Sequence, residues 1–216
     1  MKLEVKNLEK KFKDFTAVNN VNFSIKDGKT LGLLGPNGCG KTTTIGMLLG
    51  LIKPSKGEIL IDGNNFEQLN REEILSKFNF ASPYVELPKK LTVKENLEIY
   101  GRLYGIKHLT ERINEIITDL NLKPFINKKT GELSSGQKNR VSLAKSLINK
   151  PEILFLDEPT ASLDPDIGDF VRKYIEQYKS KNKISILLAS HNMKEVERLC
   201  DEVIMMKEGQ IVDRGT

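Results

Sequence analysis

The segment Gly35–Thr43 contains the residue types that proteins use to bind phosphate groups. It reads Gly-Pro-Asn-Gly-Cys-Gly-Lys-Thr-Thr, follows an apolar run at 31–34 that predicts a buried strand, and precedes a stretch at 44–51 that predicts a helix. Glycines let successive backbone N–H groups turn toward an anion, and a helix start adds unpaired N–H groups and a positive dipole end. The segment is therefore predicted to bind the phosphates of a nucleotide.

Individual side chains of this loop have separate predicted roles. Lys41 can reach the outer phosphates, the Thr42 hydroxyl can bind Mg²⁺, and the Thr43 hydroxyl can touch an inner phosphate. The thiol of Cys39 lies near a predicted helix start, so we expect it to be reactive and to be shielded by nucleotide. The nucleotide-binding residues predicted from the loop are Gly35, Asn37, Gly38, Cys39, Gly40, Lys41, Thr42 and Thr43.

Two acidic residues follow a second apolar run. Residues 153–156 are Ile-Leu-Phe-Leu, and Asp157 and Glu158 come directly after them. Ligands of open α/β sheets bind at the carboxyl ends of the strands, so both carboxylates are placed where a nucleotide would lie. In a phosphate-loop enzyme Asp157 would hold Mg²⁺ and Glu158 would polarise the attacking water. An isolated acidic pair is more often a solvated loop, and the phosphate-binding loop is what favours the catalytic interpretation.

Composition places the chain among globular proteins. Its 216 residues are 38% hydrophobic and 29% charged, which is typical of one domain with its own core. The net charge of +5 is spread along the chain, so no specific nucleic-acid partner is expected. No apolar run approaches the roughly 18 residues of a membrane span, no export signal is recognised, and two cysteines are typical of a reducing compartment.

The order of the predicted elements indicates an α/β fold with a mostly parallel, doubly wound sheet. Alternating patterns at 2–6 and 21–25 predict a small N-terminal antiparallel sheet. Further strands are predicted at 58–61, 78–80, 152–156, 184–189 and 203–206, and further helices at 166–179 and 192–199.

A region rich in helical spacing interrupts this α/β pattern. Helices are predicted at 92–104, 110–120 and 136–148, with Thr92 and Thr110 as their first two starting points. The chain is thus predicted to be a single domain, 1–216. Within it, a P-loop core at 1–81 and 150–216 would surround an inserted helical subdomain at 82–149.

Three further positions have both a binding and a structural interpretation. Phe12 and Phe15 lie in a polar stretch where a ring could stack on a base, although either is more often a core residue. Ser134–Gln137 opens a helix with groups that could bind an anion or simply cap the helix. His191 follows the predicted strand at 184–189 and could contact a phosphate or cap the next helix.

Together these motifs resemble the nucleotide-binding domain of an ATP-binding cassette (ABC) transporter, over essentially the whole chain. Gly35–Thr43 matches the Walker A loop, 133–137 the signature motif and 153–158 the Walker B strand with its catalytic glutamate. Residues 162–164 match the D-loop, and His191 matches the switch histidine. The family pattern adds these residues to the predicted nucleotide site: Phe12 for the adenine, and Ser134, Ser135, Gly136, Gln137 and Asp164.

The resemblance implies an ATPase that works as a head-to-tail dimer with a second copy or a paralogous cassette. ATP and Mg²⁺ are the implied cofactors, Thr42 and Asp157 the implied metal ligands, and Glu158, His191 and Lys41 the implied catalytic residues. It also implies a separate transmembrane permease, which would hold the chain on the cytoplasmic face of the cell membrane. The short chain and its Ser-Pro-Tyr segment at 82–84 resemble exporters of the ABC-2 type.

Two departures from the family pattern affect these expectations. Ser135 stands where the signature motif usually has a glycine, and serine suits a helix start. The segment 78–92 lacks the glutamine that the family places near Mg²⁺ and the attacking water, and Ser82 could replace it. The alternative function is a soluble cassette ATPase acting on DNA or ribosomes, although the long coiled-coil insertion or second cassette of such proteins is missing. A GTPase would usually show Asn-Lys-x-Asp, which is also missing.

Overall fold

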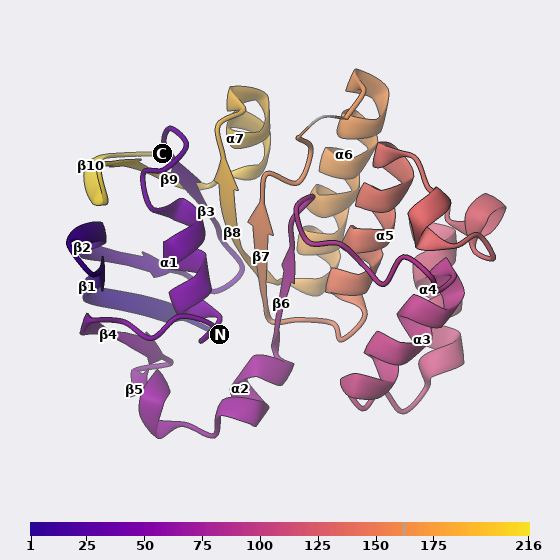
Figure 1. Ribbon diagram of the computed structural model, residues 1–216, viewed down its shortest axis with the longest axis horizontal. Coiled ribbons are helices and arrows are strands. Elements are labelled where there is room, and N and C mark those ends of the chain that lie inside the picture. Colours follow the sequence, from indigo (N-terminus) through magenta and orange to yellow (C-terminus); the bar gives the residue numbers. More distant parts are fainter. Residues whose placement is uncertain (162) are drawn as a thin grey trace.

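A six-stranded sheet forms the centre of the computed structural model, which describes residues 1–161 and 163–216 (Figure 1). Its strand order is β10-β9-β3-β8-β7-β6. Neighbouring strands pair in parallel except β10, which pairs antiparallel with β9, so the predicted mostly parallel sheet is confirmed. Its strands are β3 (Thr30–Leu34), β6 (Phe78–Ala81), β7 (Ile153–Asp157), β8 (Ser185–Ser190), β9 (Glu202–Lys207) and β10 (Gln210–Gly215).

The predicted N-terminal antiparallel sheet is also present, with the order β2-β1-β4-β5. Its strands β1 and β2 are longer than predicted, because they continue to a tight turn where Phe12 pairs with Phe15. Lysines fill much of this extension and hide its strand pattern. The strands are β1 (Leu3–Phe12), β2 (Phe15–Ile25), β4 (Lys56–Ile61) and β5 (Asn64–Asn65).

Helices α3 to α7 begin within one residue of the predicted starts, whereas α1 begins at Lys41, three residues before the predicted 44, and α2 was not predicted. Thr92 caps α3 through a reciprocal pair of hydrogen bonds with Glu95, as its sequence position predicts. Thr110, by contrast, lies inside α4, which begins one residue earlier, after the exposed His108. The helices are α1 (Lys41–Leu48), α2 (Arg71–Ser76), α3 (Val93–Leu103), α4 (Leu109–Asp119), α5 (Ser135–Leu147), α6 (Pro165–Asn182) and α7 (Met193–Leu199), with 3₁₀ turns at Phe66–Gln68, Lys123–Phe125 and Thr130–Glu132.

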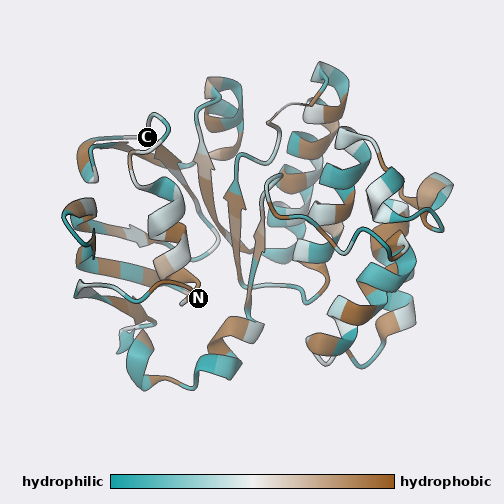
Figure 2. Ribbon diagram, viewed as in Figure 1, coloured by the Kyte–Doolittle hydropathy of each residue, from teal (hydrophilic) through white to brown (hydrophobic). Residues whose placement is uncertain are grey.

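Alternate side chains of the central strands contribute to two hydrophobic cores. In β7, Ile153 and Phe155 pack into the core that contains α1 and the antiparallel sheet. Leu154 and Leu156 point the other way, into the core that contains α3 to α6. Figure 2 shows this apolar lining as brown strands at the centre of the molecule. Because α1 and α5 belong to different cores, the two helices lie on opposite faces of the parallel sheet.

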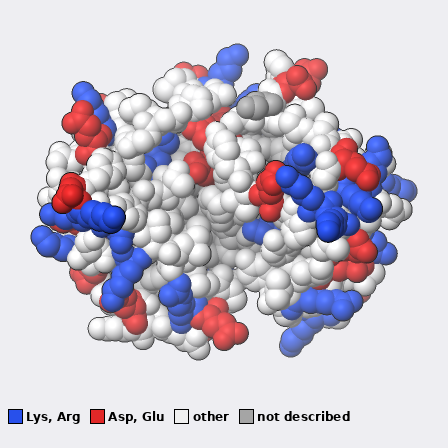
Figure 3. Space-filling view, viewed as in Figure 1, with Lys and Arg blue, Asp and Glu red and all other residues white. Residues whose placement is uncertain are grey.

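The predicted helical insertion shares its core with the sheet. Buried side chains of α3, α4 and α5 form one cluster with those of β7, β8 and α6. The division into a core and a subdomain at 82–149 therefore stays a prediction. Among the described residues, none of the helices is long and apolar enough to cross a membrane. On the face seen in Figure 3, positive and negative side chains are intermixed around the edge.

Candidate active site

The phosphate-binding loop connects β3 to α1 and depends on a glycine at its last position. Gly40, the residue before α1, has a backbone φ of 108°, which is unfavourable for any residue with a side chain. A Cβ atom there would also lie 2.5 Å from the backbone oxygen of Ala17, in β2. The loop thus lies in close contact with β2 of the antiparallel sheet. Only glycine fits at position 40.

Lys41 extends back over this loop. Its Nζ atom donates hydrogen bonds to the backbone oxygens of Gly35 at 2.6 Å and Pro36 at 3.1 Å. The side chain is largely buried, so the ammonium group is held inside the loop rather than in bulk solvent. A fixed positive charge at this place can bind the outer phosphates of a nucleotide.

A pocket of about 310 Å³ surrounds the loop and brings several predicted residues together. Its lining comes from the antiparallel sheet, the phosphate loop, the segment after β6 and the end of β7. The lining residues are Phe15, Ala17, Asn37, Gly38, Gly40, Lys41, Thr42, Thr43, Tyr84, Asp157 and Glu158.

Thr42 and Asp157 form the part of the pocket that fits a hard divalent cation. The hydroxyl of Thr42 donates a hydrogen bond of 3.2 Å to Oδ2 of Asp157. Burial raises the pKa of Asp157, and the neighbouring Glu158 raises it further, while Thr42 and Lys41 act in the opposite direction. A hydroxyl and a carboxylate in contact are oxygen ligands that suit Mg²⁺, which usually takes one or two carboxylates and completes its shell with phosphates and water.

Glu158 and His191 lie in contact at the same edge of the sheet. His191 Nδ1 is 2.6 Å from Oε1 of Glu158, because each residue directly follows one of the neighbouring strands β7 and β8. Glu158 is buried and has a left-handed backbone with φ of 52°. Its N–H donates to the backbone oxygen of Ala189 at 2.8 Å, which fixes this unfavourable conformation.

The signature residues lie away from this pocket, at the start of α5. Ser134 and Gln137 exchange hydrogen bonds between side chain and backbone, which makes a stable helix start. Gly136 is needed there because a Cβ atom would lie 2.7 Å from Cδ1 of Ile167, in α6. Ser135 is exposed, and none of Ser134–Gln137 is among the described residues that line the phosphate pocket.

The structure separates the two candidate aromatic residues. Phe15 lines the phosphate pocket and is 62% exposed, whereas Phe12 is 45% exposed and is not among the described residues that line it. The interpretation of either ring as a core residue is wrong, because both are exposed and flank the two-residue turn between β1 and β2. The adenine-binding role of Phe12 stays a prediction.

Two other expectations need correction. Ser82 is buried and its hydroxyl accepts a hydrogen bond from the Tyr84 N–H, so Tyr84 rather than Ser82 extends into the phosphate pocket. Nothing in the sequence pattern singled out Tyr84. Cys39 is buried in the core that contains α1 and is not among the described residues that line the pocket, so the prediction of a reactive thiol shielded by nucleotide is wrong.

Only part of the predicted D-loop, 162–164, lies among the described residues. Asp164 precedes α6, is exposed, and accepts a hydrogen bond from the Gly168 N–H through its backbone oxygen. Ser162 lies outside the described residues. Asp164 is therefore placed on the surface, near the start of α6, and its coupling role stays a prediction.

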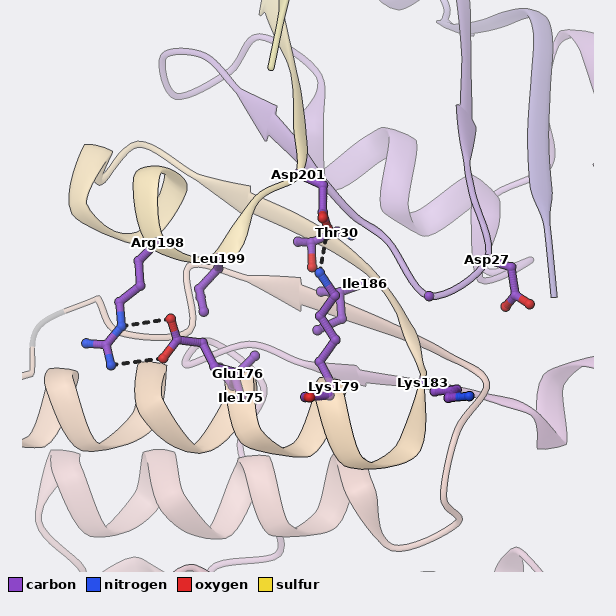
Figure 4. Close-up of a pocket in the computed structure, with 12 residues that line it drawn as sticks. Asp27, Thr30, Ile175, Glu176, Lys179, Lys183, Ile186, Arg198, Leu199 and Asp201 are labelled. Atoms are coloured by element: carbon purple, nitrogen blue, oxygen red, sulfur yellow. Dashed lines mark hydrogen bonds and ion pairs between the residues drawn. The ribbon is translucent and has the colours of Figure 1, made fainter.

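A separate cavity of about 500 Å³ lies between α6, α7 and the strand ends opposite the phosphate loop (Figure 4). Its charged side chains mostly pair with one another. Arg198 donates two hydrogen bonds to Glu176, and Lys179 pairs with Asp201. These pairs join α6 to α7 and to the start of β9, which indicates a structural role for the cavity walls.

A match to a family model identifies the protein family of this chain. Residues 18–161, which include the phosphate loop, the helix start at α5 and both acids after β7, match the family model described as "ABC transporter". The chain belongs to the ABC transporter family. It is an ATP-binding subunit of that family of ATPases.

Relatives within the ABC family include proteins named for export and for import. The chain is 36% identical over 203 residues to the ABC transporter ATP-binding protein NatA of Bacillus subtilis, covering 92% of this chain and 81% of that protein. It is 38% identical to the bacitracin transport ATP-binding protein BcrA of Bacillus licheniformis, covering 98% and 68%. The methionine import ATP-binding protein MetN of Staphylococcus haemolyticus is 36% identical, covering 98% and 63%.

Solved ABC cassettes share the whole fold. A dimeric post-hydrolysis structure of the ATP-binding cassette MJ0796 with ADP and phosphate aligns with a TM-score of 0.90 at 27% identity, over 99% of this chain and 98% of that one. The cbiO1 protein of Clostridium perfringens, part of the ABC transporter complex cbiONQ, aligns with a TM-score of 0.85 at 29% identity, over 99% and 87%. The predicted ABC cassette fold is thus confirmed.

Proposed function

We propose that this chain hydrolyses ATP as part of a head-to-tail dimer and that the cycle drives outward transport through a separate membrane subunit. One observation carries the proposal: the phosphate loop, Asp157 and Glu158 share a pocket, while the signature helix start lies elsewhere on the chain. Each chain therefore offers two incomplete halves of a site.

The residues of the pocket divide the work of hydrolysis. Lys41 binds the outer phosphates through its positive charge, and Thr42 and Asp157 hold Mg²⁺, which would neutralise phosphate charge. Glu158 accepts a proton from the attacking water, and His191 keeps the carboxylate of Glu158 oriented through the 2.6 Å contact. The roles of Lys41, Thr42, Asp157 and Glu158 follow from their chemistry and position in the pocket, and that of His191 follows from its contact with Glu158.

The second half of each site would come from another cassette, either a second copy or a paralogue. The start of α5 presents backbone N–H groups and two serine hydroxyls, which suit the terminal phosphate. Covering the pocket with this helix would exclude water and add hydrogen-bond donors where charge develops in the transition state. The MJ0796 cassette, which shares the fold of this chain and is dimeric in its solved structure, supports this arrangement.

The substitution Glu158→Gln tests the dimer directly. It keeps the size of the side chain but removes the base, so we expect ATP to bind, hydrolysis to fall by about 100-fold or more, and a stable dimer to accumulate. Size-exclusion chromatography with ATP and Mg²⁺ measures the dimer, and phosphate release measures hydrolysis. Turnover equal to that of the unmodified chain would falsify the assignment of Glu158 as the base.

A groove beside the pocket is the proposed docking site for the membrane subunit. It has a volume of about 360 Å³ and lies between the segment after β6, α5 and the residues Ala161 and Leu163, which precede α6. Val85 and Tyr84 are exposed at its edge, and Leu87 and Leu133 line it. This contact would hold the chain on the cytoplasmic face of the membrane. Val85→Asp should abolish co-purification with the membrane subunit, whereas Leu51→Asp, at an even more exposed apolar residue elsewhere, should not.

Export is supported by relatives named for export, including a Nod factor export ATP-binding protein of Burkholderia orbicola that is 36% identical over 99% of this chain and 70% of that protein. Membrane vesicles of known orientation test the direction of transport. Inverted membrane vesicles that carry both subunits should accumulate substrate when ATP is added outside. ATP-driven loss of substrate from the same vesicles would indicate import.

A further inference from the structure

A buried glutamate outside the predicted site lies directly behind the catalytic pair. Glu195, in the first turn of α7, is 1% exposed. A buried carboxylate is costly unless both of its oxygens accept hydrogen bonds. Oε1 of Glu195 accepts from the hydroxyl of Thr160, and Oε2 accepts from the hydroxyl of Ser190 at 2.5 Å.

These two partners lie next to the two residues of the catalytic pair, Thr160 in the loop after β7 and Ser190 at the end of β8. Thr160 is two residues after Glu158, and Ser190 directly precedes His191. Arg172, in α6, donates a hydrogen bond of 3.4 Å to the Thr160 hydroxyl. The carboxylate of Glu195 therefore bridges the loop after β7 and the end of β8. None of Glu195, Thr160 and Ser190 is among the described residues that line the phosphate pocket.

The orientation of the Ser190 hydroxyl links this bridge to the chemistry. Its oxygen lies 2.5 Å from Glu195 and 3.4 Å from Oε2 of Glu158, and it accepts the Asn192 N–H at 3.0 Å. A hydroxyl has only one proton to donate, and the shorter contact takes it. Glu195 thus draws the Ser190 proton away from Glu158, whose Oε2 stays available to accept a proton from water.

We propose that Glu195 is a positioning residue for ATP hydrolysis, which bridges Thr160 and Ser190 and so holds Glu158 and His191 in their relative orientation. The anchor for this bridge is α7, whose Arg198 pairs with Glu176 of α6 (Figure 4). The inference rests on the proposed hydrolytic function. It adds a residue that makes no contact with nucleotide.

Two nearly isosteric substitutions test the bridge. Thr160→Val removes one hydroxyl without changing shape, and Glu195→Gln replaces one accepting oxygen by a donor. Each should lower kcat by about tenfold and leave KM for ATP unchanged, because a small misplacement of catalytic groups affects the reaction more than binding. The double variant should be no slower than the slower single variant, because both changes break the same bridge.

The matched control is Glu197→Gln, at an exposed residue of the same helix, which should keep the kcat of the unmodified chain. Thermal unfolding of each variant shows whether the fold is retained. Unchanged kcat in both single variants, a rise in KM with constant kcat, or independent additive losses would overturn the proposal. If the unmodified chain itself did not hydrolyse ATP in this assay, the proposed function would fail, and this inference with it.

Discussion

The Nδ1 atom of His191 lies 2.6 Å from Oε1 of Glu158, although 33 positions separate the two residues in the sequence. The contact exists because β7 and β8 are neighbours and end at the same edge of the sheet. Glu158 is buried while His191 remains largely exposed, and the histidine contacts the carboxylate without being among the described residues that line the phosphate pocket. The chemistry of the site thus depends on strand order.

His191→Ala should lower kcat for ATP hydrolysis by about tenfold to 100-fold, because the carboxylate of Glu158 loses the partner that orients it. KM for ATP should change much less, since Lys41 and the phosphate loop still bind the phosphates. Steady-state phosphate release at saturating ATP measures the effect. His108→Ala, at an exposed histidine far along the chain, provides the control. Equal kcat in both variants would contradict the role of His191.

The adenine-binding ring is assigned by comparing Phe12→Ala with Phe15→Ala. Loss of a stacking ring should weaken ATP binding by about tenfold, and by more in the Phe12 variant if the family resemblance holds. Binding of inorganic triphosphate should not change in either variant, because it has no base. Titration with each ligand separates these effects. A larger loss in the Phe15 variant would move the stacking role to the ring that lines the pocket.

Gly40→Ala should destabilise the folded chain by about 2 kcal/mol or more, because a left-handed backbone and a close approach to Ala17 both oppose a side chain. Gly38→Ala is the matched control. Gly38 also has a positive φ, of 81°, but in the described part of the chain no atom lies within 4 Å of the position of an added Cβ. Chemical denaturation should therefore give a clearly smaller loss for Gly38→Ala. Equal losses would show that the contact with β2 is unimportant.

Asp201 should make stability depend on pH in the acid range. Burial raises its pKa, but hydrogen bonds from Lys179, from the Thr30 N–H and from Lys29 outweigh burial and lower the pKa to about 2. Its contribution is fully present above about pH 4, the ordinary pKa of an aspartate, and is lost as pH falls toward 2.

Asp201→Asn should therefore lower the free energy of unfolding by about 1 to 2 kcal/mol at pH 7, allowing for partial exposure of the carboxylate. The difference from the unmodified chain should shrink as the pH approaches 2. Urea denaturation across this range measures it. The exposed Asp14→Asn variant should show little effect at any pH. A constant difference between pH 7 and pH 2 would contradict the linkage.

The sequence was sufficient for the elements with strong local signals. Apolar strands β7 and β8 and the capped start of α3 were predicted within one or two residues, because burial and capping are local properties. The outer half of the β1–β2 hairpin and the edge strand β10 were missed. Exposed strands with charged residues have no clear alternation, and only pairing with a neighbouring strand stabilises them.

In the candidate site, too, only the residues of local sequence motifs could be predicted. The phosphate loop and the two acids are contiguous motifs, so their residue types reveal them. Tyr84 and Glu195 are not recognisable in this way. A glutamate in the first turn of a helix is ordinarily a solvated residue that favours the helix dipole. Only the adjacency of β7 and β8 brings Thr160, in the loop after β7, and Ser190, at the end of β8, to the same carboxylate of Glu195.

The central claim is that each ATP site is shared between two cassettes, and mixing two inactive variants tests it most directly. Lys41→Ala disables the phosphate loop. Ser135→Glu leaves a favourable helix start on α5 but repels the terminal phosphate that the partner binds. Each variant alone should hydrolyse almost no ATP.

An equal mixture of the two should recover roughly a quarter of the unmodified turnover, because half of the dimers are mixed and each mixed dimer has one intact site. Phosphate release from the mixture, compared with each variant at the same total concentration, is the deciding measurement. Recovery above both parents is the result that the shared site predicts. A mixture no more active than its components would contradict it.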